Sequence, residues 1–216
     1  MKSAIVILMW SCLWSFPALA LQNVGLRHVV LTKDLADRKL DVAVLYPTLS
    51  SQRATLIGDN PAFFGLPAIE NAEPESGIHP LVVISHGYGG SWRNQLWLAH
   101  ALVQKGYIVA APNHPGTTTA EMDDGIAASL WLRPDDLSRV ITAVQQRRDV
   151  GNVAPEHIAV VGHSLGGWTS DGFSCSFVTG SALLVRRVSF VTIRYMRIIS
   201  VTMWANATMY GASSPS

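Results

Sequence analysis

The chain has 216 residues, of which 49% are hydrophobic and 14% are charged, and its formal net charge is +1. This length suits one α/β domain, and this composition excludes a disordered chain. The near-neutral charge offers no electrostatic argument for binding nucleic acid or an acidic membrane. Function must therefore be inferred from local motifs.

Residues 1–20 have the parts of a secretory signal peptide: Lys2 gives a positive start, an apolar stretch follows, and residues 18–20 (Ala-Leu-Ala) fit a cleavage site. The apolar stretch is short for a membrane span of about 20 residues, and an uncleaved anchor is the alternative. Cleavage removes Cys12 and leaves only Cys175, so the mature chain has no internal disulfide. We predict a protein exported to the periplasm or secreted.

Two apolar, β-branched runs over residues 27–32 and 40–46 are joined by a short polar link, which predicts an antiparallel hairpin. Pro47 is expected to end the second strand, because proline lacks the N–H that a ladder requires. Residues 48–80 are rich in Pro, Gly, Asn and Ser and lack clear periodicity, which predicts a long functional loop. Within this loop, residues 63–67 either line an acyl pocket or, as we prefer, anchor the loop.

A buried strand and a glycine-rich loop follow. Residues 81–84 are Leu-Val-Val-Ile, and residues 86–90 read His-Gly-Tyr-Gly-Gly. An apolar run that ends in glycines is typical of a strand-to-helix turn. Ser91 is then a suitable N-cap for a helix over residues 92–105, and Gly106 is a suitable end for it.

Residues 107–111 predict the next buried strand, and His114 follows at its carboxyl end, where ligands of open α/β sheets bind. We interpret His114 as a structural hydrogen-bonding histidine, because catalysis also requires geometry toward a nucleophile. The acidic residues 121–124 have no histidine or further carboxylate at ligand spacing, so a solvated loop is favoured over a metal site. The sequence predicts no metal and no cofactor.

A helix is predicted from Pro134 to about Arg148. Asp135 and Asp136 lie at its positive end, and arginines lie at its negative end. Its apolar positions form one stripe: Leu137, Val140, Ile141 and Val144. Such a helix packs as a crossover between parallel strands, which predicts a βαβ arrangement.

The central motif follows an apolar strand expected over residues 158–161. Residues 162–166 read Gly-His-Ser-Leu-Gly, which fits G-x-S-x-G. In a nucleophile elbow the serine occupies a strained turn between strand and helix, and the two glycines let the flanking backbones approach. Ser164 is therefore the candidate nucleophile and the Leu165 N–H a candidate oxyanion donor. A glycine-rich turn with a solvated serine is the alternative.

Four segments together resemble one family. They are residues 86–90 (HGYGG), 111–116 (APNHPG), 133–136 (RPDD) and 162–167 (GHSLGG). As a set within about residues 27–169, they are similar to the bacterial dienelactone-hydrolase-like and platelet-activating-factor-acetylhydrolase-like branch of the α/β-hydrolases.

This resemblance implies an α/β-hydrolase fold, with a mostly parallel sheet and flanking helices. It also implies that the loop after residues 81–84 supplies the second oxyanion donor, which by position is the N–H of Tyr88. Dienelactone hydrolases use a cysteine nucleophile, whereas this chain has Ser164. That difference favours ester hydrolysis of the acetylhydrolase kind.

The catalytic triad cannot be completed in the chain order of this fold, which is Ser, then Asp or Glu, then His. After Ser164 the only carboxylate is Asp171, and all seven histidines precede the serine. His86 or His114 would have to serve as the base, or activity would be very low.

The composition changes at about residue 170. Residues 172–216 contain four arginines and no lysine or acidic residue. Residues 171–180 are poor helix formers where the elbow requires a helix, and residues 189–199 favour a strand. We interpret residues 171–216 as an atypical tail, frameshifted or recombined, attached to an incomplete α/β-hydrolase domain over residues 21–170. A divergent family member is the alternative.

Two functions remain open. One is a serine-dependent carboxylic ester hydrolase, impaired by the missing triad histidine, and the other is an inactive truncated fragment. The expected partner is a small-molecule ester, with no nucleic acid and no stable membrane span, because arginines interrupt the apolar tail.

Overall fold

The computed structural model describes residues 23–32 and 38–179, with side chains through Phe173. The predicted signal peptide, most of the hairpin link and the strand expected over residues 189–199 lie outside the described residues. The strands are β1 (Asn23–Leu31), β2 (Leu40–Thr48), β3 (Thr55–Ile57), β4 (Leu66–Glu70), β5 (Ile78–Ser85), β6 (Ile108–Asn113) and β7 (Asn152–Gly162). The helices are η1 (Trp92–Gln95), α1 (Leu96–Val103), α2 (Asp124–Ala127), η2 (Leu130–Leu132), α3 (Arg133–Gln146) and α4 (Leu165–Thr179).

The strands of the described part form one mixed sheet in the order β3-β4-β1-β2-β6-β5-β7. Strands β6, β5 and β7 run parallel, and β2 joins them antiparallel to β6. The βαβ unit predicted before the elbow is present, because α3 connects β6 to β7 and both strands pair with β5. The predicted fold class, an α/β-hydrolase fold with flanking helices, is confirmed.

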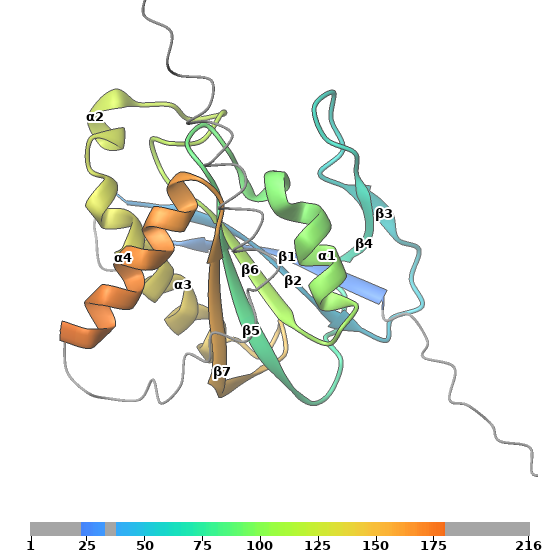
Figure 1. Cartoon of the computed structure of the whole chain (residues 1–216). Coiled ribbons are helices and arrows are strands. Elements are labelled where there is room, and N and C mark those ends of the chain that lie inside the picture. Colours follow the sequence, from blue (N-terminus) through green and yellow to red (C-terminus); the bar gives the residue numbers. More distant parts are fainter. Residues whose placement is uncertain (1–22, 33–37, 180–216) are drawn as a thin grey trace, which may run out of the picture.

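Helices cover both faces of the sheet (Figure 1). On one face, α3 and α4 pack over a core that includes Val42, Val83 and Leu137. On the other face, η1 and α1 pack over a core that includes Leu45, Val82 and Leu96. Central strands buried on both faces read as continuous apolar runs, which is why residues 81–84 are recognisable from sequence.

The predicted hairpin is confirmed, since β1 and β2 pair antiparallel along their whole length. The expectation that Pro47 ends β2 is wrong, because Pro47 pairs with Val24 inside the ladder. The Pro47 carbonyl accepts a hydrogen bond from the Glu75 N–H at 2.8 Å, on the side away from β1. The proline nitrogen faces the same side, so the ladder to β1 needs no N–H from it.

Residues 48–80 are not one irregular loop, since they contain the antiparallel pair β3 and β4. The preferred interpretation of residues 63–67 as an apolar anchor is also wrong for Phe64, which is 97% exposed. Short strands with proline and glycine between them carry too little periodicity to be recognised from sequence.

Both predicted helices are present, with two differences: the first is divided into η1 and α1, and α3 begins at Arg133, one residue before the predicted start. Ser91 caps η1 in a capping box with Asn94, and α1 continues directly from it. The apolar stripe of α3 is buried at all its members: Leu137, Val140, Ile141 and Val144.

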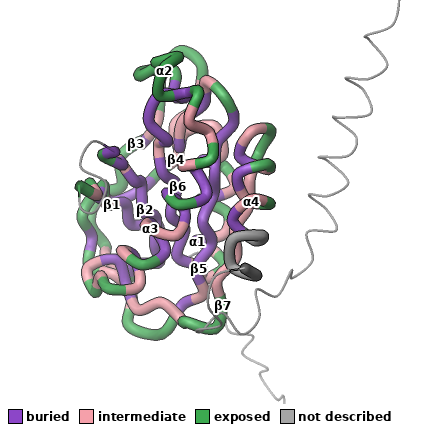
Figure 2. The backbone as a smooth tube through the Cα atoms, turned by 90° about the vertical axis from the view of Figure 1, so that its left-hand side faces the viewer, coloured by how far each residue is buried: buried purple, intermediate pink, exposed green. Residues whose placement is uncertain are grey.

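Strand β7 lies at the edge of the described sheet, with β5 as its only neighbour there. Residues 158–161 are therefore half-buried, whereas they were expected to be buried (Figure 2). The exposed edge is a direct consequence of having no described strand beyond β7.

The expectation that residues 171–180 are unsuited to a helix is wrong, because α4 continues to Thr179. Tertiary packing outweighs the weak propensity. A Cβ added at Gly172 would lie 3.1 Å from Cγ of Pro134, so the glycine allows α4 to approach α3 closely. Phe173 is 4% exposed and joins the core under α3.

Candidate active site

Ser164 lies in the sharp turn between β7 and α4, with φ at 54°. This left-handed conformation is unfavourable for a residue with a side chain and persists only when the surroundings impose it. The serine is exposed. The backbone at residue 164 thus has the strained geometry that the G-x-S-x-G pattern predicts.

Two glycines allow this turn to close. A Cβ added at Gly162 would lie 1.9 Å from the carbonyl oxygen of Gly166. A Cβ added at Gly166 would lie 2.0 Å from the carbonyl oxygen of Ser85, at the end of β5. Both contacts are far below van der Waals distance, so any side chain there would force the strand and the helix apart.

The glycine-rich loop after β5 lies against the elbow. A Cβ added at Gly87 would lie 3.2 Å from Cβ of Ser164. The next two glycines are tied down, since Gly89 N–H donates to the Thr117 carbonyl at 3.0 Å and Gly90 N–H to the Gly87 carbonyl at 3.1 Å. The loop therefore packs against Ser164 at Gly87 and is bonded to Thr117 at Gly89.

The two candidate oxyanion donors are unengaged. Among the described residues, the N–H groups of Tyr88 and Leu165 have no hydrogen-bond acceptor. Leu165 is the first residue of α4, where backbone N–H groups have no intrahelical partner. Neither amide is thus occupied by an acceptor of the described residues.

No base among the described residues contacts the serine. Within the part of the chain that the structure describes, Ser164 Oγ has no hydrogen-bond partner. Asp171 is exposed, about 10 Å further along α4. The structure therefore does not complete a triad around Ser164.

His86 and His114 are not placed to act as that base. His86 is 1% exposed; its Nε2 accepts from the His114 backbone N–H at 3.0 Å, so its Nδ1–H donates to the Gly87 carbonyl at 2.7 Å. His114 is fully buried, and its Nδ1 and Nε2 are bound to Asp136 and Ser85. The structural role predicted for His114 is confirmed, and the suggestion that either histidine replaces the base is contradicted.

Burial keeps both rings neutral. It lowers the pKa of His86 to about 3, with a further contribution from the neighbouring His114. Burial also lowers the pKa of His114 to about 4, although the hydrogen bond to Asp136 partly opposes this. A neutral His114 donates from Nδ1 to Asp136 and accepts at Nε2 from the Ser85 hydroxyl, each at 2.9 Å.

Asp136 of α3 is fully buried and carries the charge of this cluster. The guanidinium of Arg38 binds it in bidentate fashion, with contacts of 2.8 and 2.7 Å. Burial raises the pKa of Asp136, but hydrogen bonds from His114 and Arg38 outweigh that effect and lower the pKa overall. Asp136, His114 and Ser85 thus form a serine–histidine–aspartate chain that is inaccessible to a substrate.

Arg133, the first residue of α3, is 1% exposed and links the elbow to the glycine loop. Its Nε donates to Thr169 Oγ1 of α4 at 3.0 Å, and its Nη1 donates to Thr117 Oγ1 at 2.9 Å. Its Nη2 donates to Ser85 Oγ at 3.3 Å and to the His86 carbonyl.

From the sequence, residues 133–136 were recognised only as one of the four segments that resemble the family. The hydrogen-bonding roles of Arg133 and Asp136 were not predicted. One signal was present: a cation in the first turn of a helix opposes the helix dipole, which favours acidic residues there. An arginine in that place indicates a specific contact elsewhere.

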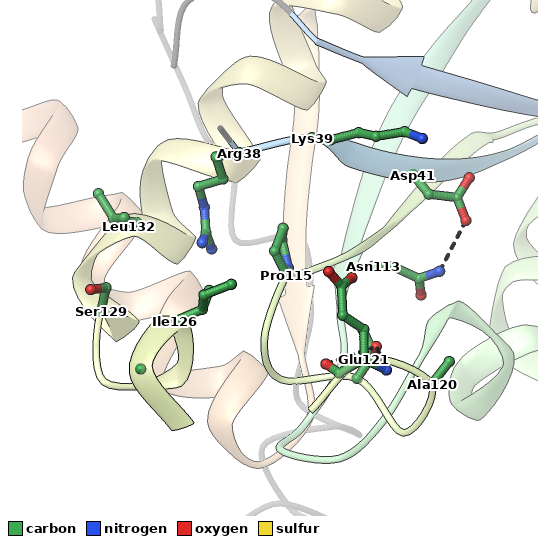
Figure 3. Close-up of a pocket in the computed structure, with 12 residues that line it drawn as sticks. Arg38, Lys39, Asp41, Asn113, Pro115, Ala120, Glu121, Ile126, Ser129 and Leu132 are labelled. Atoms are coloured by element: carbon green, nitrogen blue, oxygen red, sulfur yellow. Dashed lines mark hydrogen bonds between the residues drawn. The ribbon is translucent and has the colours of Figure 1, made fainter. Parts of the chain in front are cut away.

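A separate pocket of about 720 Å³ opens beside the loop after β6 (Figure 3). Its wall combines charged and amide groups, and Asn113 donates to Asp41 across it at 3.0 Å. Neither Ser164 nor Tyr88 lines it. The lining residues are Arg38, Lys39, Asp41, Asn113, Pro115, Thr118, Ala120, Glu121, Gly125, Ile126, Ser129 and Leu132.

The acidic residues 121–124 were expected to form a solvated loop, and part of them instead starts a helix. Asp123 caps α2 by accepting from the Ile126 N–H at 3.0 Å. Across the described residues, no cluster of histidine, cysteine or carboxylate groups is arranged to hold a metal ion. The same residues include no helix with the length and hydropathy of a membrane span.

Comparisons with known proteins agree with this architecture. Residues 77–173 match the family described as serine aminopeptidase, S33. A ferulic acid esterase from Streptomyces cinnamoneus is 25% identical, with a TM-score of 0.61 over 75% of this chain and 58% of that one. A carboxyl esterase from Bacillus coagulans is 14% identical, with a TM-score of 0.45 over 72% of this chain and 42% of that one.

The chain thus spans 58% of the first of these structures and 42% of the second. No curated protein sequence matches it. The matched segment covers the glycine-rich loop, α3 and the elbow, and the likeness to the first esterase extends over 75% of the chain. Together with the fold, these findings place the chain in the α/β-hydrolase superfamily.

Proposed function

We propose that this protein is a serine-dependent carboxylic ester hydrolase, impaired by the lack of a triad histidine after Ser164. We assign it to the dienelactone-hydrolase-like and acetylhydrolase-like branch on the four sequence segments that resemble that branch. The 25% identity to a ferulic acid esterase supports ester hydrolysis over other hydrolase reactions. The substrate proposed is a small-molecule ester.

One observation carries the proposal: an exposed serine in a left-handed turn, with a φ of 54°, between a strand and a helix. A strained backbone at a residue whose side chain makes no stabilising contact indicates a functional role. Two unengaged N–H groups, of Tyr88 and Leu165, support an oxyanion site next to it.

In the proposed reaction, Ser164 Oγ attacks the ester carbonyl carbon, and the amides of Tyr88 and Leu165 bind the resulting oxyanion. The alcohol then leaves, and water hydrolyses the acyl-serine. With no base in contact with Oγ among the described residues, the proposed reaction has solvent take the serine proton. In a characterised serine protease, removal of a triad member lowers turnover by about 10⁴- to 10⁶-fold, so residual activity is expected to be low.

The second candidate is an inactive fragment of a hydrolase. It is favoured by the unpartnered Ser164 Oγ and by the exposed edge of β7 in the described residues. We further propose export through the segment at residues 1–20, on its sequence features alone.

The test is covalent labelling of the purified protein with a fluorophosphonate probe. Wild type is compared with Ser164→Ala, and Ser51→Ala, an exposed serine away from the elbow, is the matched control. A p-nitrophenyl acetate assay and an alanine p-nitroanilide assay then separate ester from amide hydrolysis.

Labelling of wild type and Ser51→Ala, but not of Ser164→Ala, with turnover of the ester alone, is the expected result. Absence of labelling in a cooperatively folded wild type would favour the inactive fragment. Turnover of the anilide in preference to the ester would exclude an esterase.

A further inference from the structure

The two proposed oxyanion donors come from segments far apart in sequence. Tyr88 follows β5, and Leu165 follows β7. An oxyanion site works only when its donors keep a fixed separation from the nucleophile, because a displacement of 1 Å can cost about 100-fold in rate. Some element of the fold must therefore hold the glycine loop and the elbow in register.

Arg133 is bonded to both segments at once. Its Nη2 donates to the carbonyl of His86, two residues before Tyr88. Its Nε donates at 3.0 Å to Thr169 Oγ1, which itself donates to the Leu165 carbonyl at 2.9 Å. One rigid guanidinium thus reaches the backbone next to each proposed donor.

The Arg133 side chain also binds Thr117, which is bonded to the glycine-rich loop. Its Nη1 donates to Thr117 Oγ1, and the Thr117 carbonyl holds the Gly89 N–H. Only arginine presents donors in a planar fork that can meet acceptors on several sides. The three donors of a lysine radiate from one nitrogen and cannot reach both Thr169 and Thr117 with this geometry.

Burying the charged Arg133 side chain costs desolvation free energy, and filling space in the core does not require a charge there. Arg133 is 1% exposed, and among the described residues no carboxylate forms an ion pair with it. Burial lowers its pKa to about 10, with a partly compensating effect of Asp136, so the side chain stays charged at neutral pH. An apolar side chain would fill this volume without the desolvation penalty of a buried cation.

We infer that Arg133 is a positioning residue that fixes the glycine loop and the nucleophile elbow relative to each other. This inference rests on the proposed function, because it assigns a purpose to that same site. Arg133 contacts no reacting atom; it acts through the His86 carbonyl and through Thr169.

Two readouts test it, one of which needs no activity. The first is the second-order rate of fluorophosphonate labelling of Ser164. The second is deuterium uptake by the amides of residues 86–90 and 163–168, compared with the amides inside β5 and β6. The variants are Arg133→Met, Arg133→Lys and Thr169→Val, and the matched control is Arg147→Met, at the other end of α3.

Arg133→Met is expected to lower the labelling rate about 100-fold and to speed exchange in both segments while β5 and β6 stay protected. Thr169→Val removes one bond to a charged donor and is expected to lower labelling about tenfold. Arg133→Lys is expected to recover only part of the rate, and Arg147→Met all of it. In a further variant, Arg133→Ala, added ethylguanidinium is expected to restore labelling, and the neutral ethylurea is expected not to restore it.

Wild-type labelling and exchange in Arg133→Met would overturn the inference, as would a uniform rise of exchange that includes β5 and β6. If Arg133→Met does not fold, Thr169→Val decides by the same two readouts. If wild type itself is not labelled, the proposed function fails, and the exchange of residues 86–90 and 163–168 still decides the role of Arg133.

Discussion

Acidification from pH 7 to pH 5 should destabilise this fold through two buried histidines. His86 and His114 are neutral in the folded protein because burial lowers their pKa values to about 3 and about 4. In the unfolded chain a histidine has a pKa of about 6.5. Between these values the unfolded state takes up a proton at each ring and the folded state does not.

This difference in pKa between the folded and unfolded states makes the free energy of unfolding fall as the pH falls. Stability from these groups is fully present above about pH 6.5 and is lost as the pH falls toward the folded pKa values. Each histidine contributes about 1.36 kcal/mol per pH unit, or about 2 kcal/mol between pH 6.5 and 5, so together they cost about 4 kcal/mol. Asp136, whose pKa is lowered, titrates below this window and does not contribute to it.

Urea unfolding at pH 7, 6 and 5, followed by tryptophan fluorescence, measures the effect. The charged or titratable groups that face His114 are Asp136, Arg133, Arg38 and the ring of His86. In the folded protein His86 stays neutral, and Asp136 and Arg133 stay charged, between pH 7 and pH 5. His114→Asn should reduce the slope of the unfolding free energy against pH from about 2.7 to about 1.4 kcal/mol per pH unit, because one proton is then taken up on unfolding in place of two. His157→Asn, at an exposed residue, is the matched control. A free energy of unfolding that is constant from pH 7 to 5 would refute the reasoning.

Three further predictions concern single sites. Gly166→Ala places a Cβ 2.0 Å from the Ser85 carbonyl oxygen, so it should abolish labelling and lower the free energy of unfolding by about 3 kcal/mol. Normal labelling would contradict the view that the elbow needs this close approach of α4 to β5. Arg38→Met leaves the fully buried Asp136 without its bidentate partner and should lower the free energy of unfolding in urea by about 3 kcal/mol; a loss under about 1 kcal/mol would show that His114 and Arg139 suffice. Phe64→Ser, at a side chain 97% exposed, should change stability by less than about 0.5 kcal/mol and leave labelling intact; a larger loss in the melt would mean that Phe64 packs.

Much of the fold could be predicted because its strongest signals are local. The run at residues 81–84 is buried on both faces, and the stripe on α3 repeats at the helical period. The elbow is also local, since its backbone strain and its two glycines lie within residues 162–166. Pro47 and residues 171–180 were misjudged because their propensities are weak compared with the packing that surrounds them.

The sequence by itself determined the candidate nucleophile, the glycine-rich loop and the absence of any histidine after Ser164, because each is a property of residue identity and order. Only the tertiary structure decided what the earlier histidines do and why Arg133 is there. Ser85 belongs to β5, His114 to the loop after β6, and Arg133 and Asp136 to α3, so these residues meet only when β5, β6 and α3 pack together. Burial then determines which of these side chains are charged. The sequence has no pattern that predicts such burial, because a polar side chain can be buried only when partners from other elements bind it.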